Sequence, residues 1–124
     1  MPIHITGTGS FIPKNKVKNN SFVDKAFFDK DGNGYPNTNN EIIEKFQSIT
    51  GIQERRYADK EHTTSDLAAF ASIEAIKDAD IDKESLDYII VAHNFGNIEY
   101  GTNQYISLPS VATMVKHKLE IINE

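Results

Sequence analysis

The order of apolar and polar positions along the chain predicts helices and strands in alternation. The clearest apolar run covers residues 88–92, Tyr-Ile-Ile-Val-Ala, and is rich in β-branched side chains. A short run without polar interruption is typical of a strand buried on both faces, as in a parallel sheet covered by helices. Helical patterns precede it at residues 65–79 and follow it at residues 110–119. Helix, buried strand and helix in this order indicate an α/β protein.

An earlier helical pattern covers residues 40–51. Asn39 or Asn40 is the candidate N-cap, and Gly51 supplies a stop signal at the other end. The apolar positions recur at helical spacing and form one face, which contains Ile42, Ile43, Phe46 and Ile49. The segment after it, residues 52–57, is expected to be extended. Its charged centre, Glu54-Arg55-Arg56, is interpreted as a structural Glu/Arg pair that holds a loop rather than as a substrate contact.

The helix over residues 65–79 has few polar positions. Thr63 and Asp66 fit a capping box at its start. Small side chains follow one side of it, at Ala68, Ala71 or Ser72, Ala75 and Ala79. This composition predicts a mostly buried helix that packs closely against neighbours on more than one side. The last helix begins near Ser110, and its apolar face contains Val111, Met114, Val115 and Leu119.

The N-terminal region is expected to open with a short strand at residues 3–7. Gly7 and Gly9 follow it at the spacing of a dinucleotide-binding fingerprint, but the third glycine position holds Ile12 and no helix starts there. A tight turn with close backbone packing is therefore favoured over a cofactor site. Residues 14–20 carry three lysines and are interpreted as a solvated loop before a short helix through residues 22–27.

Two other groups of polar residues are candidates for chemistry. Residues 29–34 satisfy the first half of a calcium-loop pattern, but Asn40 stands where the bidentate Glu should be, so a Gly/Asn turn, as an insertion, is favoured. His93 and Asn94 follow the apolar run at residues 88–92, where α/β proteins place binding groups. A satisfied polar pair at a strand end is favoured over catalysis.

Composition and charge limit the functional classes. The chain has 124 residues, enough for one domain, and a net charge of -5, which argues against a nucleic-acid surface. It contains no Cys, so it has no disulfide and no thiolate nucleophile. No apolar run approaches the roughly 20 residues of a membrane span, and no secretory signal is visible. A cytoplasmic location without a membrane, metal or cofactor is the resulting expectation.

Four segments, in their order and spacing, resemble β-ketoacyl-acyl-carrier-protein synthase III. Residues 5–13 resemble its opening strand and turn, and residues 64–92 resemble its helix, acidic loop and I-I-V-A strand. The other two matches are Thr50-Gly51-Ile52-Gln53-Glu54-Arg55 to a T-G-I-x-E-R signature, and Leu108-Pro109-Ser110-Val111-Ala112 to a helix start of aromatic-Pro-Ser-Ala-Ala. The resemblance covers nearly the whole chain, with an apparent insertion at residues 29–37.

The resemblance implies a partial thiolase-like fold, the N-terminal part of the first βαβαβαββ half, with the Ala-rich helix buried against a mixed sheet. Members of this family transfer an acyl group to a Cys and condense it with malonyl carried on acyl-carrier protein, releasing CO₂. The family's Cys, His and Asn lie in later segments, so residues 1–124 are expected to form an N-terminal fragment with no catalytic residue. His93 and Asn94 do not match the catalytic positions.

The resemblance also concerns substrate binding. The aromatic residue before Pro-Ser reaches into the partner's acyl pocket in the family's dimer, and here it is Leu108, the one substrate-binding candidate. Family members that use coenzyme A stack a Trp and an Arg on its adenine, and the corresponding positions are Lys45 and Ile49. Coenzyme A is therefore in doubt as the acyl donor. In the intact enzyme, acyl-carrier protein and an acyl thioester are the expected partners, and a homodimer is the expected assembly.

Two alternatives remain open from the sequence. One is a non-catalytic α/β module that binds a partner through the loop at residues 94–107. The other is a different thiolase-superfamily enzyme that makes polyketide-like products. The residues before position 124 do not separate the second alternative from a synthase III-like enzyme of fatty acid biosynthesis.

Overall fold

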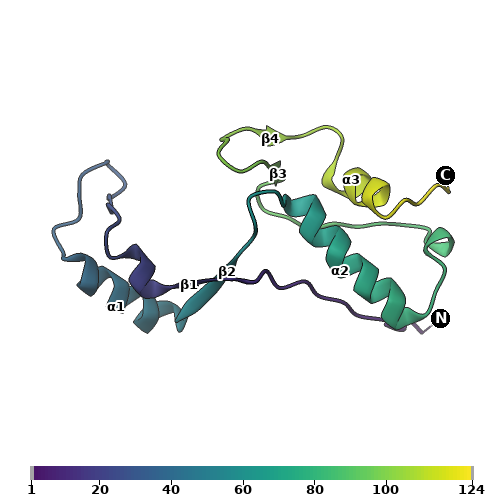
Figure 1. The fold of residues 1–124 in the computed structure, drawn as a ribbon, viewed down its shortest axis with the longest axis horizontal. Helices are drawn as coiled ribbons and strands as arrows, with labels where there is room; N and C mark the ends of the chain where they lie inside the picture. Colours follow the sequence, from purple (N-terminus) through teal and green to yellow (C-terminus); the bar gives the residue numbers. More distant parts are fainter. Residues whose placement is uncertain (1, 124) are drawn as a thin grey trace. The chain divides into compact units, whose positions relative to one another are not determined.

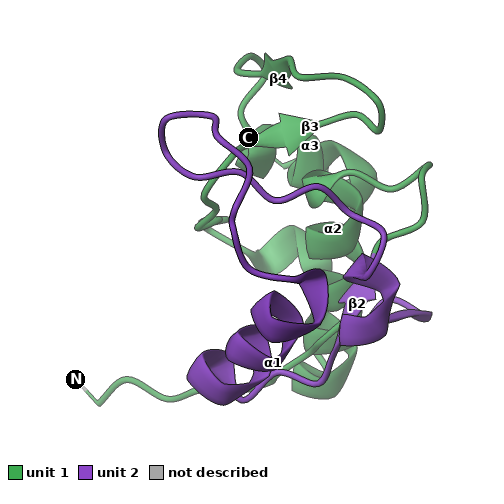
Figure 2. Ribbon diagram, turned by 90° about the vertical axis from the view of Figure 1, so that its left-hand side faces the viewer, with its two compact units in different colours: residues 1–12, 58–124 green, residues 13–57 purple. Residues whose placement is uncertain are grey.

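A computed structural model describes residues 2–123, which form two compact units. Unit 1 contains residues 1–12 and 58–124, and unit 2 contains residues 13–57 (Figure 2). The elements of unit 2 are β1 (Asn15–Lys18), η1 (Asn19–Phe22), α1 (Asn39–Thr50) and β2 (Glu54–Tyr57). Those of unit 1 are α2 (Thr64–Ala79), η2 (Lys83–Ser85), β3 (Asn97–Ile98), β4 (Tyr105–Ile106) and α3 (Val111–Lys118).

Helix α1 confirms the predicted helix, but its N-cap is Thr38 rather than Asn39 or Asn40. Thr38 and Glu41 form a capping box, in which the Thr38 amide donates to the Glu41 carboxylate at 2.8 Å. The Asn39 side chain is used elsewhere, because its amide donates to the carbonyls of Val23 and Lys25. Gly51 ends the helix with a φ of 68°, as its stop signal predicts.

The lysine-bearing segment that precedes η1 is a strand, so its interpretation as a loop is wrong. β1 pairs antiparallel with β2, with Lys16 opposite Arg56 and Lys18 opposite Glu54. No local pattern signals this pairing, because the partner strand lies far along the chain. The prediction of a short helix through residues 22–27 is wrong, because the 3₁₀ turn η1 ends at Phe22 and residues 23–27 are not helical.

Helices α2 and α3 pack on each other and form the core of unit 1. Its buried members come from α3 and the residues after it: Val111, Val115, Leu119 and Ile121. Thr63 and Asp66 form the predicted capping box of α2, and Ser110 caps α3. Of the residues in α2, only Ser65 and Ala69 are fully buried in the described part of the chain. Ten further residues of α2 are half-buried and four are exposed, so the prediction of a mostly buried helix is confirmed only in part, whereas α2 does pack against neighbours on more than one side, α3 and the N-terminal segment.

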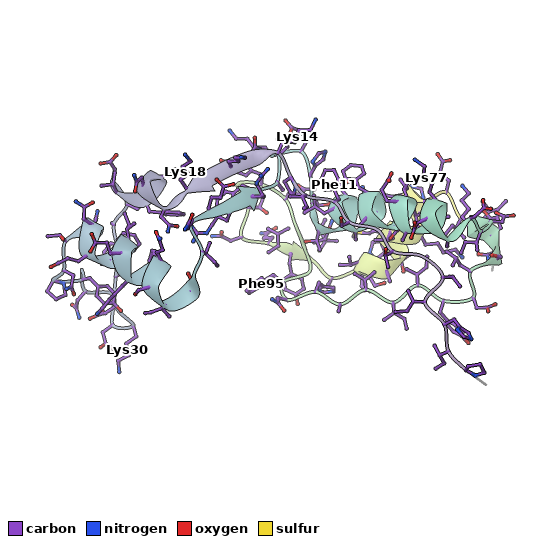
Figure 3. The ribbon with its side chains drawn as sticks, turned by 90° about the horizontal axis from the view of Figure 1, so that it is seen from below. Phe11, Lys14, Lys18, Lys30, Lys77 and Phe95 are labelled. Atoms are coloured by element: carbon purple, nitrogen blue, oxygen red, sulfur yellow. The ribbon has the colours of Figure 1, made fainter. Side chains whose placement is uncertain are left out.

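The N-terminal segment lies along α2 in close backbone contact (Figure 1). A Cβ built on Gly7 would lie 2.5 Å from the Ala79 amide nitrogen, and one on Gly9 would lie 2.3 Å from the Ala71 carbonyl oxygen. Only glycine permits this approach. The Phe11 ring lies 4.7 Å from the Phe70 ring of α2 and contributes to the same contact (Figure 3). Both observations support the interpretation of the two glycines as close packing.

The segments expected to be strands beside α2 are extended but unpaired. Among the described residues, none of the backbone groups at positions 3–7 or 88–92 is in a strand ladder. Ile89 and Val91 pack against the core, whereas Tyr88 and Ile90 are 86% and 93% exposed. The prediction of a strand buried on both faces is therefore wrong. The mixed sheet is also not present, since both sheets in residues 2–123 are antiparallel pairs, β1-β2 and β3-β4.

Candidate functional site

The end of the extended segment at residues 88–92 is held by hydrogen bonds to a tight bend. His93 Nδ1 accepts a hydrogen bond from the Gly96 amide at 2.9 Å, and the Thr64 hydroxyl donates to the Gly96 carbonyl at 2.7 Å. Gly96 has a φ of 75°, a conformation that favours glycine. The ring nitrogen of His93 is thus used in a local structural contact. For His93 this geometry supports a satisfied structural group over a catalytic one, although the segment before it is not a strand.

An open groove of about 430 Å³ lies beside this bend. It is bounded by the bend, by β4 and by the start of α3, through side chains that include His93, Asn94, Phe95, Tyr105 and Ser110. The groove is thus lined by an imidazole, an amide, a phenol and hydroxyl groups, which can orient a polar ligand by hydrogen bonds. None of the side chains that line it is a thiol or a carboxylate.

Leu108, the candidate substrate-binding residue, stands next to this groove in the chain but does not line it. Its side chain is 83% exposed, between the end of β4 and the start of α3. The turn after it is fixed by the helix, because the Ser110 hydroxyl accepts a hydrogen bond from the Thr113 amide. The rigid start of α3 therefore holds an exposed apolar side chain at the surface of unit 1.

Lys45 and Ile49 both lie on α1 in unit 2 and are exposed. They are four residues apart, so they share one face of that helix. An ammonium and an aliphatic side chain offer no aromatic ring or guanidinium on which a planar base could stack. The structure thus leaves the doubt about coenzyme A in place.

The sequence did not predict a polar cluster where α2 begins and α3 ends. Lys118 Nζ lies 2.5 Å from the Asp66 carboxylate, and the buried Asn97 side chain accepts a hydrogen bond from the Ser65 amide at 2.8 Å. Burial raises the pKa of Asp66, but hydrogen bonds from Lys118 and Thr63 outweigh burial and lower that pKa to about 2. The capping motif signalled Asp66, whereas its pairing with Lys118 needs the packing of α2 on α3.

The suspected calcium loop is a turn closed on itself. The Asp29 carboxylate accepts hydrogen bonds from the amides of Asp31 and Asn33, at 2.9 and 2.8 Å. These bonds, that from Asn33 above all, lower the pKa of Asp29. Over residues 2–123 no three acidic or His side chains are grouped so that they could hold a metal ion. The geometry favours the Gly/Asn turn.

The helices and strands make this chain α/β in character, and comparison with known proteins adds the family. No family model matches the chain. It is 38% identical over 119 residues to a protein of Staphylococcus epidermidis named β-ketoacyl-[acyl-carrier-protein] synthase III. A Staphylococcus aureus protein of the same name is 36% identical over 119 residues. Each alignment covers 96% of this chain and 31% of the relative.

The chain is thus similar over nearly its whole length to proteins named β-ketoacyl-acyl-carrier-protein synthase III, and it spans about a third of their length. This confirms the resemblance drawn from the four sequence segments. No helix within residues 2–123 combines the length and the apolar character needed to cross a bilayer.

Proposed function

We propose that this chain is the N-terminal segment of a synthase III-like acyltransferase of fatty acid biosynthesis, working in the cytoplasm as part of a homodimer. In this reaction a thioester-bound acyl group on an enzyme Cys is condensed with malonyl-acyl-carrier protein. A carbon–carbon bond forms, CO₂ leaves, and the Cys thiolate is released. The identity to synthase III proteins over 96% of the chain carries the proposal.

The segment contributes structure and substrate contacts rather than catalytic groups. It holds no Cys, so it cannot form the acyl-enzyme by itself, and we infer that it is inactive alone. The unpaired backbone at residues 3–7 and 88–92 and the exposed Tyr88 and Ile90 support this view, since they offer a strand edge and an apolar surface to further polypeptide. The same features count against a self-sufficient binding module.

A chimera tests the proposal directly. The matching 119 residues of the S. epidermidis synthase are replaced by this chain, and release of CO₂ from malonyl-acyl-carrier protein is measured. We expect condensing activity within about tenfold of the parent enzyme, because the segment would supply no reacting group. A chimera that folds as a dimer but releases no CO₂, or that does not fold while the parent does, contradicts the proposal.

Leu108 is proposed to line the acyl pocket, with Leu108→Trp in the chimera as the test. The larger ring should fill pocket volume and shift the preferred acyl chain to shorter lengths, by about tenfold in relative kcat/KM. Ile122→Trp is the matched control, because Ile122 is as exposed as Leu108 and lies beyond α3. If the acyl chain-length preference is unchanged in Leu108→Trp, or shifts equally in the control, Leu108 does not line the acyl pocket.

A further inference from the structure

The turn over residues 29–34 of unit 2 contains two residue pairs that can cyclise. Asp31 precedes Gly32 and Asn33 precedes Gly34, and no other Asp or Asn of the chain is followed by glycine. A glycine has no side chain to shield its backbone nitrogen from the carboxyl or amide carbon of the preceding residue. Both pairs are exposed to solvent. Covalent change is therefore sterically open at either pair.

Hydrogen bonds occupy the backbone nitrogen of Gly32 but not that of Gly34. The Gly32 amide donates to the Asp29 carbonyl at 3.1 Å. The amides on either side of Gly34 are occupied too. That of Asn33 donates to the Asp29 carboxylate at 2.8 Å, and that of Tyr35 donates to a backbone carbonyl at 3.0 Å. In the described part of the chain, the Gly34 amide donates no hydrogen bond, so its nitrogen is open to reaction.

The surroundings of Gly34 and the side chain of Asn33 both permit a reaction between them. A Cβ built on Gly34 would meet nothing within 4 Å, so no group crowds this nitrogen. The Asn33 side chain donates to the Asp29 carboxylate over a long 3.4 Å, which is a weak hydrogen bond. Little energy therefore opposes rotation of the Asn33 carboxamide toward the Gly34 nitrogen.

We propose that Asn33 is a modification site, which deamidates spontaneously through Gly34 and thereby opens the turn. The Gly34 nitrogen gives its proton to water and attacks Asn33 Cγ, forming an N–C bond. The Cγ–Nδ2 bond breaks, and Nδ2 takes up a proton and leaves as ammonia. Water then opens the cyclic imide at either of its two carbonyls, which gives aspartate or an isoaspartate linkage. The reaction needs only the chain and water, so it does not rest on acyl transfer.

Either product weakens the turn at Asp29. Hydrogen bonds, that from the Asn33 amide above all, lower the pKa of Asp29, so this carboxyl is ionised at neutral pH. Deamidation replaces the Nδ2 donor by an oxygen, and the 3.4 Å contact becomes a repulsion between two carboxylates. An isoaspartate linkage also lengthens the backbone by a carbon atom. It would displace the residue 33 carbonyl, which accepts from the Asp29 amide at 2.8 Å.

Incubation of the full 124-residue chain in ammonia-free buffer at neutral pH, followed by peptide mass spectrometry, tests the site. Trypsin releases residues 31–45 as one peptide, which contains Asn37, Asn39 and Asn40 as internal controls. We expect Asn33 to deamidate at least about tenfold faster than these three, because only Asn33 precedes a glycine. In water enriched in heavy oxygen, the label should enter residue 33. Equal rates at the four asparagines overturn the proposal.

A comparison of the two glycines tests the argument from hydrogen bonds. Unfolding in guanidinium chloride should accelerate isoaspartate formation at Asp31 at least about tenfold, because it releases the Gly32 amide. The rate at Asn33 should change by less than about threefold, because the Gly34 amide is already unbonded in the folded chain. If folding protects Asn33 as strongly as it protects Asp31, the structure does not select this site and the proposal is wrong.

Gly34→Ala separates blocked cyclisation from a folding defect. Its methyl group would enter open space, so the turn should form as before, but the methyl group would shield the backbone nitrogen. Deamidation of Asn33 should then slow by about tenfold or more. A rate that Gly34→Ala leaves unchanged would overturn the assignment of the Gly34 nitrogen as the attacking group.

Asn33→Asp supplies the charge of the product and tests the opening of the turn. Hydrogen exchange of the Tyr35 amide should accelerate about tenfold, because its bond closes the same turn. Asn40→Asp is the matched control, since Asn40 is exposed in the first turn of α1, where added negative charge is favourable. The control should exchange as the wild type does. If Asn33→Asp also exchanges as the wild type does, deamidation does not open the turn.

Discussion

The two units are stabilised by different interactions. Unit 1 buries a continuous apolar cluster under α3, yet its longest extended segments have no strand partner among the described residues. Unit 2 has a four-residue ladder between β1 and β2, yet its buried residues are only Ile43 and Asn19. Unit 1 therefore has most of the apolar burial and unit 2 has the longer strand ladder, whereas a complete α/β layer requires both in one place.

The two units differ in this way because they contain different kinds of secondary-structure element. A helix pair can bury its facing sides by itself, whereas a strand needs another strand for its amides and carbonyls. Unit 1 supplies two helices but no neighbour for residues 88–92. Unit 2 supplies two neighbouring strands but one helix. Both deficits agree with the proposal that further polypeptide completes the layer.

The largest expected difference between the units concerns the buried cluster. Val115 is fully buried, so Val115→Asp should destabilise unit 1 by at least about 4 kcal/mol, because a carboxylate would lose its hydration there. Amide hydrogen exchange, followed separately in each unit, measures the effect. Val23→Asp is the control in unit 2, where the valine is exposed and little change is expected. Equal effects would remove the distinction between the units.

Close packing of the N-terminal segment should be the next most sensitive feature. Gly9→Ala would place a methyl group against the backbone of α2 and should cost about 3 kcal/mol or release the segment. Protease cleavage within residues 2–12 would then accelerate. At Gly34, where a Cβ meets nothing within 4 Å, Gly34→Ala should leave that cleavage unchanged. Resistance of Gly9→Ala to cleavage would argue against the observed contact.

In unit 2, loss of the capping box of α1 should reduce stability less than the two changes in unit 1. Thr38→Ala removes the side chain that accepts from the Glu41 amide and should destabilise α1 by about 1 kcal/mol. Thr38→Ser retains the hydroxyl and serves as the control. Helix content measured by circular dichroism during thermal unfolding would report the difference. If Thr38→Ser loses as much helix stability as Thr38→Ala, the threonine methyl group rather than its hydroxyl stabilises the helix.

The smallest effect is expected from the ion pair in unit 1. The pKa of Asp66 is lowered to about 2 in the folded chain from an ordinary value of 3.8. Its contribution is therefore complete above about pH 4 to 5 and is lost as the pH falls toward 2. Because Asp66 is only half-buried and its partner Lys118 is exposed, solvent screens the pair, and we expect no more than about 1 kcal/mol.

Asp66→Asn and Lys118→Met should each flatten the acid limb of a stability–pH curve for unit 1. Unit 2 should be unaffected by either change, since both residues belong to unit 1. An acid limb that stays the same in both variants would show that Asp66 does not contribute.

Local sequence signals predicted the helices well and the strands poorly. The capping box at Thr63 and the stop at Gly51 both act within one turn of a helix, so a short window contains them. The pairing of β1 with β2 depends on a distant segment. The run at residues 88–92 reads as a strand buried on both faces, but exposure alternates along it because only one side meets α2 and α3.

The candidate site shows the same division. The sequence drew attention to Leu108, His93 and the glycines at 7 and 9, and the family resemblance was confirmed by relatives. The hydrogen bond from Gly96 to His93 and the pairing of Asp66 with Lys118 could not be read from it. Both need a fold that brings separate elements together.

By itself the sequence determined where the three α-helices lie, the resemblance to synthase III proteins and the absence of a Cys nucleophile, because these follow from residue identity and from contacts within one turn. Only the tertiary structure decided which extended segments are paired, which side of each is buried, and that the lysines of β1 gather with Arg56 on one exposed face. Those outcomes depend on contacts between residues far apart in the chain, whose geometry no local pattern encodes.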